Sequence, residues 1–215
     1  MPIFYDYPRA PSPRRARILL AEKGIAHDVR IVDLAAGEQL SDAFRAVNPA
    51  CTVPALVLDD GALEDGAVLT DNAAIAAWAE AAHPEPPLLG RTPLEKAMVA
   101  SWNAKIEAEC MMAIAEAMRN TAPAMKDRAL PGPENYAQIP ELAVRGAARL
   151  THFLDRFELH MAVRDYVAGG FLSLADITAC VALDFARVLK VDAYDGRPAL
   201  RAWRDRLAAR PAFEL

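Results

Sequence analysis

The sequence is poor in cysteine and contains no long apolar run. Its three cysteines, Cys51, Cys110 and Cys180, form no C-x-x-C pair and no zinc-ligand spacing. We therefore expect no disulfide scaffold and no metal site, and a reducing, cytoplasmic setting. Each thiol is expected to be a small buried apolar group. No run of about 18 apolar residues occurs, so no membrane-spanning helix and no membrane partner are predicted.

Basic residues are not concentrated in any one stretch, and the formal net charge is -5. A protein that binds nucleic acid usually carries a basic stripe or patch, so nucleic acid is not expected as a partner. Residues 1–6 lack the charged and then apolar order of a signal peptide. Of the 215 residues, 53% are hydrophobic, which is enough for one compact core or for two modest domains.

The first 82 residues alternate between strand and helix patterns. Strands are predicted at 3–5, 29–32, 55–58 and 67–69, and helices at 13–23, 41–47 and 71–82. Gly24 is a natural helix stop, and the Asp-Asp-Gly segment at 59–61 is expected to be a turn. The order β-α-β-α-β-β-α predicts an α/β layer with a mixed sheet. Residues 1–82 are therefore expected to form one α/β domain.

A proline-rich segment at 83–87 separates this region from a second one. Its three prolines exclude a helix, so the segment is expected to be a linker. Beyond it, helices are predicted from Thr92 to about residue 120 and over 141–160, 174–189 and 199–209. Thr92 followed by Pro93 is a favoured helix start. Residues 92–215 are expected to form an all-helical domain with an irregular segment at 122–140.

The dipeptide Val53-Pro54 stands at the entrance of the predicted strand at 55–58. Proline cannot donate a ladder hydrogen bond, so it must lie at the start or edge of that strand. The Val53 backbone is then free to pair with something other than the sheet, such as an extended peptide. The alternative is an ordinary trans proline that ends a loop, because about 5% of X-Pro bonds in folded proteins are cis.

Two predicted helices begin with polar residues that suit either structure or chemistry. Ser12, between Pro11 and Pro13, is expected to cap its helix or to aim its hydroxyl at a substrate atom. A helix N-terminus favours a thiolate or another anion, so the two roles are compatible. Near Asp71, free N–H groups suit a carboxylate, and the Asp71 side chain suits an ammonium group. A zwitterionic amino-acid end would fit both, and the alternative is a simple N-cap.

The helical region contains a capping-box spacing, which indicates a helix start, and a group of three methionines, which could line a pocket. Ser173 and Asp176 have the spacing of a capping box, so the Asp176 carboxylate is expected to cap a helix rather than to act in catalysis. Met111, Met112 and Met118 lie on the long helix that follows the linker. Methionine is commonly core filler, and the alternative is that these three side chains line a substrate pocket.

Five features, taken together and in order, resemble the cytosolic glutathione transferase family over essentially the whole chain. They are the opening strand and loop at 4–8, the helix R-A-R-I-L-L-A-E-K-G at 15–24, Asn48-Pro49 leading into Val53-Pro54, D-N-A-A-I at 71–75, and Y-V-A-G at 166–169 leading into S-L-A-D at 173–176. The segments T-P-L-E-K at 92–96 and L-R-A-W at 200–203 further resemble an atypical subgroup found in fungi and bacteria. The family implies a thioredoxin-like domain that binds glutathione and a helical domain that offers an apolar pocket.

The resemblance also implies a glutathione site. Pro54 would follow a cis peptide bond, and the Val53 backbone would pair with the cysteinyl part of the peptide. Many members have Glu-Ser where this chain has Asp-Asn at 71–72, and a lysine often stands where this chain has Thr52. Glu38 and Gln39 fall where members often contact the peptide. The residues assigned to glutathione are Gln39, Thr52, Val53, Pro54, Asp71 and Asn72.

The resemblance leaves the group that activates the sulfur open. When Arg15 is aligned with the arginine of the family's first helix, the usual serine position falls on Pro11, and Ser12 comes one residue later. The atypical subgroup is thought to use polar groups at the end of the long helix, which are Arg119 and Asn120 here. Either route needs only a hydrogen bond or a positive charge to lower a thiol pKa from about 8.5.

The expected function is conjugation of the glutathione thiolate to a small apolar electrophile by a homodimer. One alternative is another glutathione-dependent enzyme on the same fold, either a disulfide reductase or an isomerase. A second alternative is a non-catalytic ligand-binding protein, which Pro11 and the Asp71-Asn72 pair leave open. A thioredoxin-type redox protein is disfavoured, because the first helix contains no cysteine.

Overall fold

The computed structural model describes residues 1–58 and 67–215, so the turn expected at 59–61 lies outside the described residues. The chain forms two compact units. The first contains Met1–Pro86, Pro131–Glu134 and Leu215, and the second contains Pro87–Leu130 and Asn135–Glu214. The boundary between Pro86 and Pro87 falls inside the proline-rich segment that was expected to be a linker.

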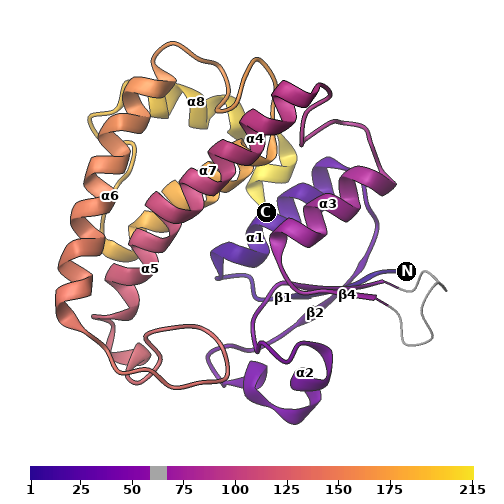
Figure 1. Cartoon of the computed structure of the whole chain (residues 1–215), viewed down its shortest axis with the longest axis vertical. Helices are drawn as coiled ribbons and strands as arrows, with labels where there is room; N and C mark the ends of the chain where they lie inside the picture. Colours follow the sequence, from indigo (N-terminus) through magenta and orange to yellow (C-terminus); the bar gives the residue numbers. More distant parts are fainter. Residues whose placement is uncertain (59–66) are drawn as a thin grey trace. The chain divides into compact units, whose positions relative to one another are not determined.

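The first unit is built on a mixed four-stranded sheet, as the sequence predicts (Figure 1). The strands β1 (Ile3–Asp6), β2 (Asp28–Ile31), β3 (Ala55–Leu58) and β4 (Ala67–Leu69) lie in the order β2-β1-β3-β4. β1 is parallel to β2 and antiparallel to β3, and β3 is antiparallel to β4. The register pairs Tyr5 with Ala55, which ends the β1–β3 ladder next to Pro54.

Helices α1 (Pro11–Glu22) and α3 (Asn72–Ala82) lie side by side in this unit, and the short helix α2 (Asp42–Val47) lies apart from them (Figure 1). α1 begins two residues before the predicted start, because proline fits the first helical position. Gly24 ends it with a φ of +62°. The Arg17 Nη1 of α1 donates to both oxygens of the buried Asp6 carboxylate of β1, at 2.6 and 2.7 Å. This ion pair ties α1, the helix that carries Ser12, to the end of β1.

Lys23 is the most unusual buried group of the first unit. Its ammonium group is inaccessible to solvent and contacts the Glu80 carboxylate at 2.5 Å. It also donates to the carbonyls of His83 and Pro86 at 2.8 and 2.7 Å. A buried ammonium is tolerated only when it is paired and hydrogen-bonded, and these three contacts meet that need. The lysine therefore fastens α1 to the end of α3 and to the chain segment that follows.

The second unit is all helical, as the sequence predicts. Helix α4 (Pro93–Ile106) continues through a π-helical turn, η2 (Glu107–Met111), into α5 (Met112–Arg119). The other helices are α6 (Pro140–Met161), α7 (Leu174–Phe185) and α8 (Pro198–Ala208). The helix predicted to reach residue 189 instead ends at Phe185 and changes to a 3₁₀ turn over Ala186–Leu189. Within the described residues, no helix is both long and apolar enough to cross a membrane.

Asp176 lies at the centre of the helical core and has the structural role expected for it. Its carboxylate accepts from the backbone N–H groups of Val167 and Ser173 and from the Ser173 hydroxyl, at 2.8 to 3.0 Å. The Trp203 indole donates to it at 3.0 Å. Burial raises the pKa of this carboxyl, and the four donors oppose that effect. Asp176 thus joins the start of α7 to α8 and to the loop that precedes α7.

Gly146 sets the distance between α5 and α6. A Cβ added at this position would lie 2.6 Å from the carbonyl oxygen of Ala113 and 2.8 Å from the nitrogen of Ala117. No side chain fits such a separation, so glycine is required by the close helix crossing. The crossing in turn holds the segment of α5 on which Met118 and Arg119 lie.

Candidate functional site

The peptide bond between Val53 and Pro54 is cis, which confirms the sequence prediction. Val53 packs with Val32 and Phe44 in a small apolar cluster, and Tyr5 and Tyr7 lie against that cluster. Since the ladder of β3 starts only at Ala55, the backbone of Val53 lies outside the sheet. Its N–H and C=O have no hydrogen-bond partner within the described residues. These two groups are therefore available to an extended ligand.

Asn48 holds the loop that leads to this dipeptide, a role that the sequence reasoning missed. The side chain is 1% exposed, and its amide nitrogen donates to the Thr52 carbonyl at 2.7 Å. Its amide oxygen accepts from the Ala50 N–H at 3.0 Å. Cys51 lies between these contacts with a φ of +55°. An asparagine next to a proline suggested a helix end, and only the fold shows that it organises residues 50–52.

The N-terminus of α3 offers a second set of unpaired polar groups. Asp71 is the N-cap, and its Oδ1 accepts from the Ala74 N–H at 2.8 Å. The N–H groups of Asn72 and Ala73 have no acceptor within the described residues. The Asp71 carboxylate is exposed, and its second oxygen remains open to solvent. Donors and a carboxylate thus lie together, as a zwitterionic ligand end requires.

Ser12 and Asn72, which are 60 residues apart in sequence, are joined by a direct hydrogen bond. The Asn72 amide nitrogen donates to the Ser12 hydroxyl oxygen at 2.8 Å. Asn72 is only 8% exposed, and Ser12 is half-buried. Of the two roles expected for Ser12, the helix cap is wrong, because α1 begins at Pro11 and its N-cap is Ala10. The serine lies inside the first turn, so its side chain is available for the contact with α3.

Gln39 is partly buried in the short 3₁₀ helix Glu38–Leu40, and its amide oxygen has no hydrogen-bond partner within the described residues. A buried acceptor without a donor is uncommon in folded proteins, and a ligand donor would satisfy it. The neighbouring Glu38 has a different role, since its carboxylate accepts from the Asp33 N–H at 2.6 Å. Of the two residues expected to contact a peptide, Gln39 is thus the one with an open polar atom.

Arg119 and Asn120 belong to the second unit, at the end of α5. The Arg119 guanidinium donates to the Arg128 carbonyl, and burial lowers the pKa of this group. The Asn120 amide donates to the Glu116 carbonyl at 2.8 Å and accepts from the Ile139 N–H at 2.8 Å. Both side chains therefore already have protein partners that hold the segment after α5 in place.

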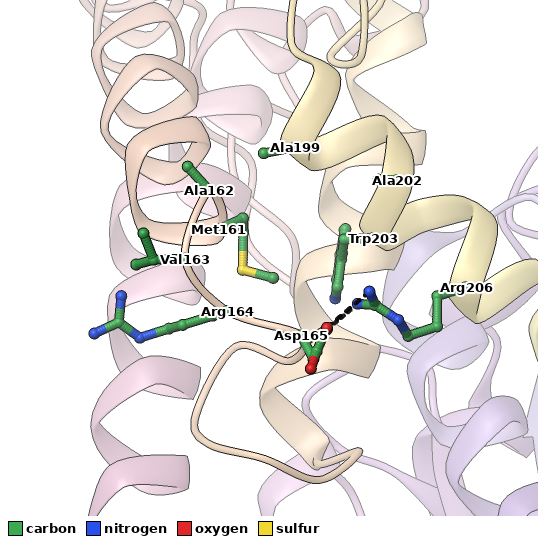
Figure 2. Close-up of a pocket in the computed structure, with 9 residues that line it drawn as sticks. All are labelled: Met161, Ala162, Val163, Arg164, Asp165, Ala199, Ala202, Trp203 and Arg206. Atoms are coloured by element: carbon green, nitrogen blue, oxygen red, sulfur yellow. Dashed lines mark hydrogen bonds and ion pairs between the residues drawn. The ribbon is translucent and has the colours of Figure 1, made fainter.

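The three methionines differ in their surroundings. Met111 and Met118 are seven residues apart, so they share one face of the helix, and both are partly buried. Met112 is 54% exposed and points away from the core. A separate cavity of about 320 Å³ lies between α6 and α8, and Figure 2 shows the residues that line it. On one side of that cavity, Arg206 and Asp165 form an ion pair at 2.9 Å, so these two charges neutralise each other.

Three features of the first unit fit a short peptide that carries a thiol. The free backbone of Val53 can pair with an extended residue, the N-terminus of α3 can hold a zwitterionic end, and the Ser12 hydroxyl can contact a sulfur atom. The open Gln39 oxygen adds an acceptor. All of these groups lie on the loops and helix starts of one α/β unit.

Comparisons with known proteins show the family of the chain. The family models that match are Glutathione S-transferase, N-terminal domain, over residues 10–82, and Glutathione S-transferase, C-terminal domain, over residues 111–211. Glutathione S-transferase 2 of Saccharomyces cerevisiae is 35% identical over 215 residues, which cover 99% of this chain and 88% of the relative.

Solved structures agree as well. The crystal structure of Gtt2 from Saccharomyces cerevisiae superposes with a TM-score of 0.87 at 33% identity, covering 99% of this chain and 98% of that one. A glutathione S-transferase domain-containing protein of Marinobacter aquaeolei gives a TM-score of 0.86 at 33% identity, with 98% and 99% covered. The chain thus belongs to the glutathione S-transferase family and is a glutathione transferase enzyme.

Proposed function

We propose that this protein binds glutathione in its first unit and transfers the glutathione thiolate to a small apolar electrophile. The observation that carries the proposal is the hydrogen bond from the Asn72 amide to the Ser12 hydroxyl. It fixes a hydroxyl at the N-terminus of α1, where the helix dipole also favours a negative charge. A hydrogen bond to the sulfur and a helix N-terminus each lower a thiol pKa.

The peptide is held by groups that the rest of the chain leaves open. The Val53 N–H and C=O pair with the cysteinyl residue, and the free N–H groups of Asn72 and Ala73 take the γ-glutamyl carboxylate. The Asp71 carboxylate takes the γ-glutamyl ammonium group. Gln39 and Thr52 contact the glycyl end, where Thr52 supplies a hydroxyl and no positive charge. Support comes from the Val53 backbone groups, the N–H groups of Asn72 and Ala73 and the Gln39 amide oxygen, which have no hydrogen-bond partner within the described residues.

Ser12 is proposed to donate a hydrogen bond to the glutathione sulfur and so to stabilise the thiolate. Its oxygen already accepts from Asn72, so the O–H is free to point elsewhere, and accepting one hydrogen bond strengthens the bond that a hydroxyl donates. Arg119 and Asn120, the other candidate activators, already donate to carbonyl groups of their own unit. We therefore place Ser12 first, with Arg119 and Asn120 as the alternative route.

The reaction forms one bond and breaks one. The glutathione thiol loses its proton to solvent, and the thiolate attacks an electron-poor carbon of the electrophile. With an aromatic halide, the new C–S bond forms and the halide leaves with its electron pair. Binding both reactants on one protein lowers the entropic part of the barrier. Met111, Met112 and Met118 are proposed to line the pocket for the electrophile. The active form is proposed to be a homodimer in the cytoplasm.

An isomerase is the second candidate function. A probable maleylacetoacetate isomerase of Caenorhabditis elegans is 35% identical over 96 residues, which cover 45% of this chain. A disulfide reductase that relies on a protein thiol is less favoured, because Cys51, Cys110 and Cys180 are all buried. A ligand-binding protein without turnover would bind glutathione or apolar compounds but would leave aromatic halides unchanged.

The proposal is tested by calorimetric titration with glutathione and by following the conjugation of an aromatic halide. We expect glutathione to bind at millimolar or lower concentration and the halide to be converted in proportion to enzyme. Ser12→Ala should slow conjugation, whereas Ser101→Ala, an exposed serine of α4, should not. No heat of binding at millimolar glutathione would refute the proposal. Binding without conjugation, together with turnover of a cis–trans substrate, would favour the isomerase.

A further inference from the structure

Strand β2 forms one edge of the sheet in the first unit, because the strand order is β2-β1-β3-β4. Its residues, Asp28–Ile31, all pair with β1 without a bulge, and all of them are exposed. Edge strands are usually blunted by a proline, a bulge or a covering segment, since their free backbone groups can pair with another chain. The sequence D-V-R-I contains no proline, and in the described part of the chain no strand pairs with its outer side. The edge is thus open to a further strand.

The outward backbone groups of this edge belong to Val29 and Ile31. The N–H groups of Asp28 and Val32, on either side of them, donate to backbone carbonyls on the β1 side at 2.9 and 2.8 Å. Since successive residues of a strand alternate in direction, the N–H and C=O of Val29 and Ile31 point away from β1. They have no hydrogen-bond partner within the described residues.

The two charged residues of β2 share one face of the sheet. Asp28 and Arg30 are two residues apart, and Arg30 lies opposite Tyr5 of β1. The Arg30 guanidinium is 5.8 Å from the centre of the Tyr5 ring and donates to the Tyr5 hydroxyl at 3.2 Å. Neither Asp28 nor Arg30 has an ion-pair partner among the residues that the structure describes. An exposed negative charge and an exposed positive charge therefore stand side by side along the edge.

A second copy of β2 supplies the partners that both charges lack. When two β2 strands run antiparallel with Val29 opposite Val29, Asp28 of each strand lies opposite Arg30 of the other. The Val29 residues exchange two backbone hydrogen bonds, because their N–H and C=O groups point outward. The two Asp28–Arg30 pairs fall at the non-hydrogen-bonded positions, where facing side chains approach most closely. The next possible register places Arg30 opposite Arg30 and is disfavoured by like charges.

The other face of β2 offers apolar surface for the same pairing. The Val29 and Ile31 side chains are 52% and 53% exposed. In the register centred on Val29, Ile31 of each strand lies diagonal to Val29 of the other. Diagonal neighbours of this kind are about 7–8 Å apart, within reach of long side chains. The pairing therefore covers part of this apolar surface as well as matching the charges.

We propose that β2 pairs antiparallel with β2 of a second copy of this chain, in the register centred on Val29. The pairing joins two four-stranded sheets into one continuous sheet about a two-fold axis. It uses none of the residues assigned to glutathione or to the electrophile. Because each strand has four residues, the interface is small and the association is weak and reversible.

The test is sedimentation equilibrium of the whole protein at about 0.2 mM, a concentration suited to a small interface. Arg30→Asp makes both charges of the strand negative, and Asp28→Arg makes both positive. Each variant should have about half the mass of the parent, since like charges then face each other. A mixture of the two variants should regain the mass of the parent, because every facing pair is again of opposite sign. The control is Arg187→Asp, an exposed arginine of the second unit, which should leave the mass unchanged.

Amide hydrogen exchange gives an independent measurement. The N–H groups of Val29 and Ile31 should exchange more slowly in concentrated than in dilute protein, and Arg30→Asp should remove this dependence. A peptide of residues 25–33 should also bind the dilute parent, whereas a peptide with the same residues in scrambled order should not.

Three results would overturn the proposal. The first is the same mass for the parent and both charge variants, and the second is no association in their mixture. The third is equal binding of the ordered and scrambled peptides, which would assign the edge to extended peptides in general. None of these measurements depends on glutathione or on conjugation, so the proposal can fail while the proposed transferase function stands, and the reverse also holds.

Discussion

Replacing Ser12 with alanine tests the proposed activation of the sulfur most directly. The change removes one hydroxyl from the first turn of α1 and leaves the helix start intact, because Ser12 is not the N-cap. It breaks the hydrogen bond with Asn72 and removes the donor that we propose for the glutathione thiolate. Alanine has a high helix propensity, so the fold of the first unit should be retained.

The magnitude follows from the worth of a hydrogen bond to a charged group. Such a bond contributes about 1.5–3 kcal/mol, which corresponds to a shift of about 1–2 units in the pKa of the bound thiol. If Ser12 lowers this pKa by about 1.5 units from about 8.5, its loss reduces the thiolate fraction about twentyfold at a pH of about 6.5. Above a pH of about 9.5 both proteins hold mainly thiolate, so the difference nearly disappears.

The assay is the pH dependence of kcat/KM for an aromatic halide, combined with an ultraviolet titration of the bound thiolate. Ser12→Ala should move the rising limb of the profile to higher pH, and Asn72→Ala should move it by a smaller amount. Ser101→Ala serves as the control. A loss of activity that is the same at every pH would refute the reasoning, because a changed thiol pKa cannot produce it. Activation would then have to be sought at Arg119 and Asn120.

Three further predictions concern stability. Gly146→Ala should lower the free energy of unfolding by about 1–3 kcal/mol in urea denaturation, because its Cβ would collide with the carbonyl of Ala113, whereas Gly170→Ala has open space and should have little effect. Lys23→Met should cost about 3–5 kcal/mol, since it leaves a carboxylate and two carbonyls without their buried cation. Two arginines of α6 lower the pKa of Glu116, chiefly through the hydrogen bond from Arg145 and also through Arg149. The stability that Glu116 contributes is therefore fully present above the ordinary carboxyl pKa. That contribution should fade as the pH falls through the lowered value, and the difference in urea midpoint between the parent and Glu116→Gln should shrink with it.

Each of these predictions has a result that contradicts it. Equal stability of the Gly146 and Gly170 variants would mean that the crossing of α5 and α6 can relax. A Lys23→Met protein as stable as the parent would show that the buried cation contributes nothing net. A difference in urea midpoint between the parent and Glu116→Gln that stays constant between neutral and acidic pH would show that the two arginines do not lower the pKa of Glu116 in the folded state.

Local sequence patterns predicted most of the elements. β3 and β4 have the predicted bounds. A proline limits β3 at its start, and the helix that begins at Asn72 limits β4 at its end. Thr92 with Glu95 and Ser173 with Asp176 start helices as their spacing indicates. The cis peptide bond at Val53-Pro54 was predicted from the resemblance to a family, which five features in order carry, since no single dipeptide indicates it.

The contacts of the candidate site depended on the fold. Ser12 and Asn72 are 60 residues apart, and only the packing of α1 beside α3 brings the hydroxyl to the amide. Capping was one of the two roles expected for Ser12, because serine is favoured at the N-cap and alanine is not. The helix begins at Pro11 with Ala10 as its N-cap, so the N-cap preference gave the wrong start. The π-helical turn was also missed, since no residue type between 107 and 111 marks an extra residue in a helix.

Asn48 holds the loop before Val53 mainly through the backbone of Thr52, so the shape of this loop does not depend on the side chain at position 52. The shorter contact runs from the amide to the Thr52 carbonyl at 2.7 Å, and the contact to the Thr52 hydroxyl is longer, at 3.3 Å. A backbone anchor does not depend on which side chain stands at position 52. Related enzymes can therefore exchange that side chain, and with it the charge offered to the glycyl end of a peptide, without rebuilding the loop that presents Val53.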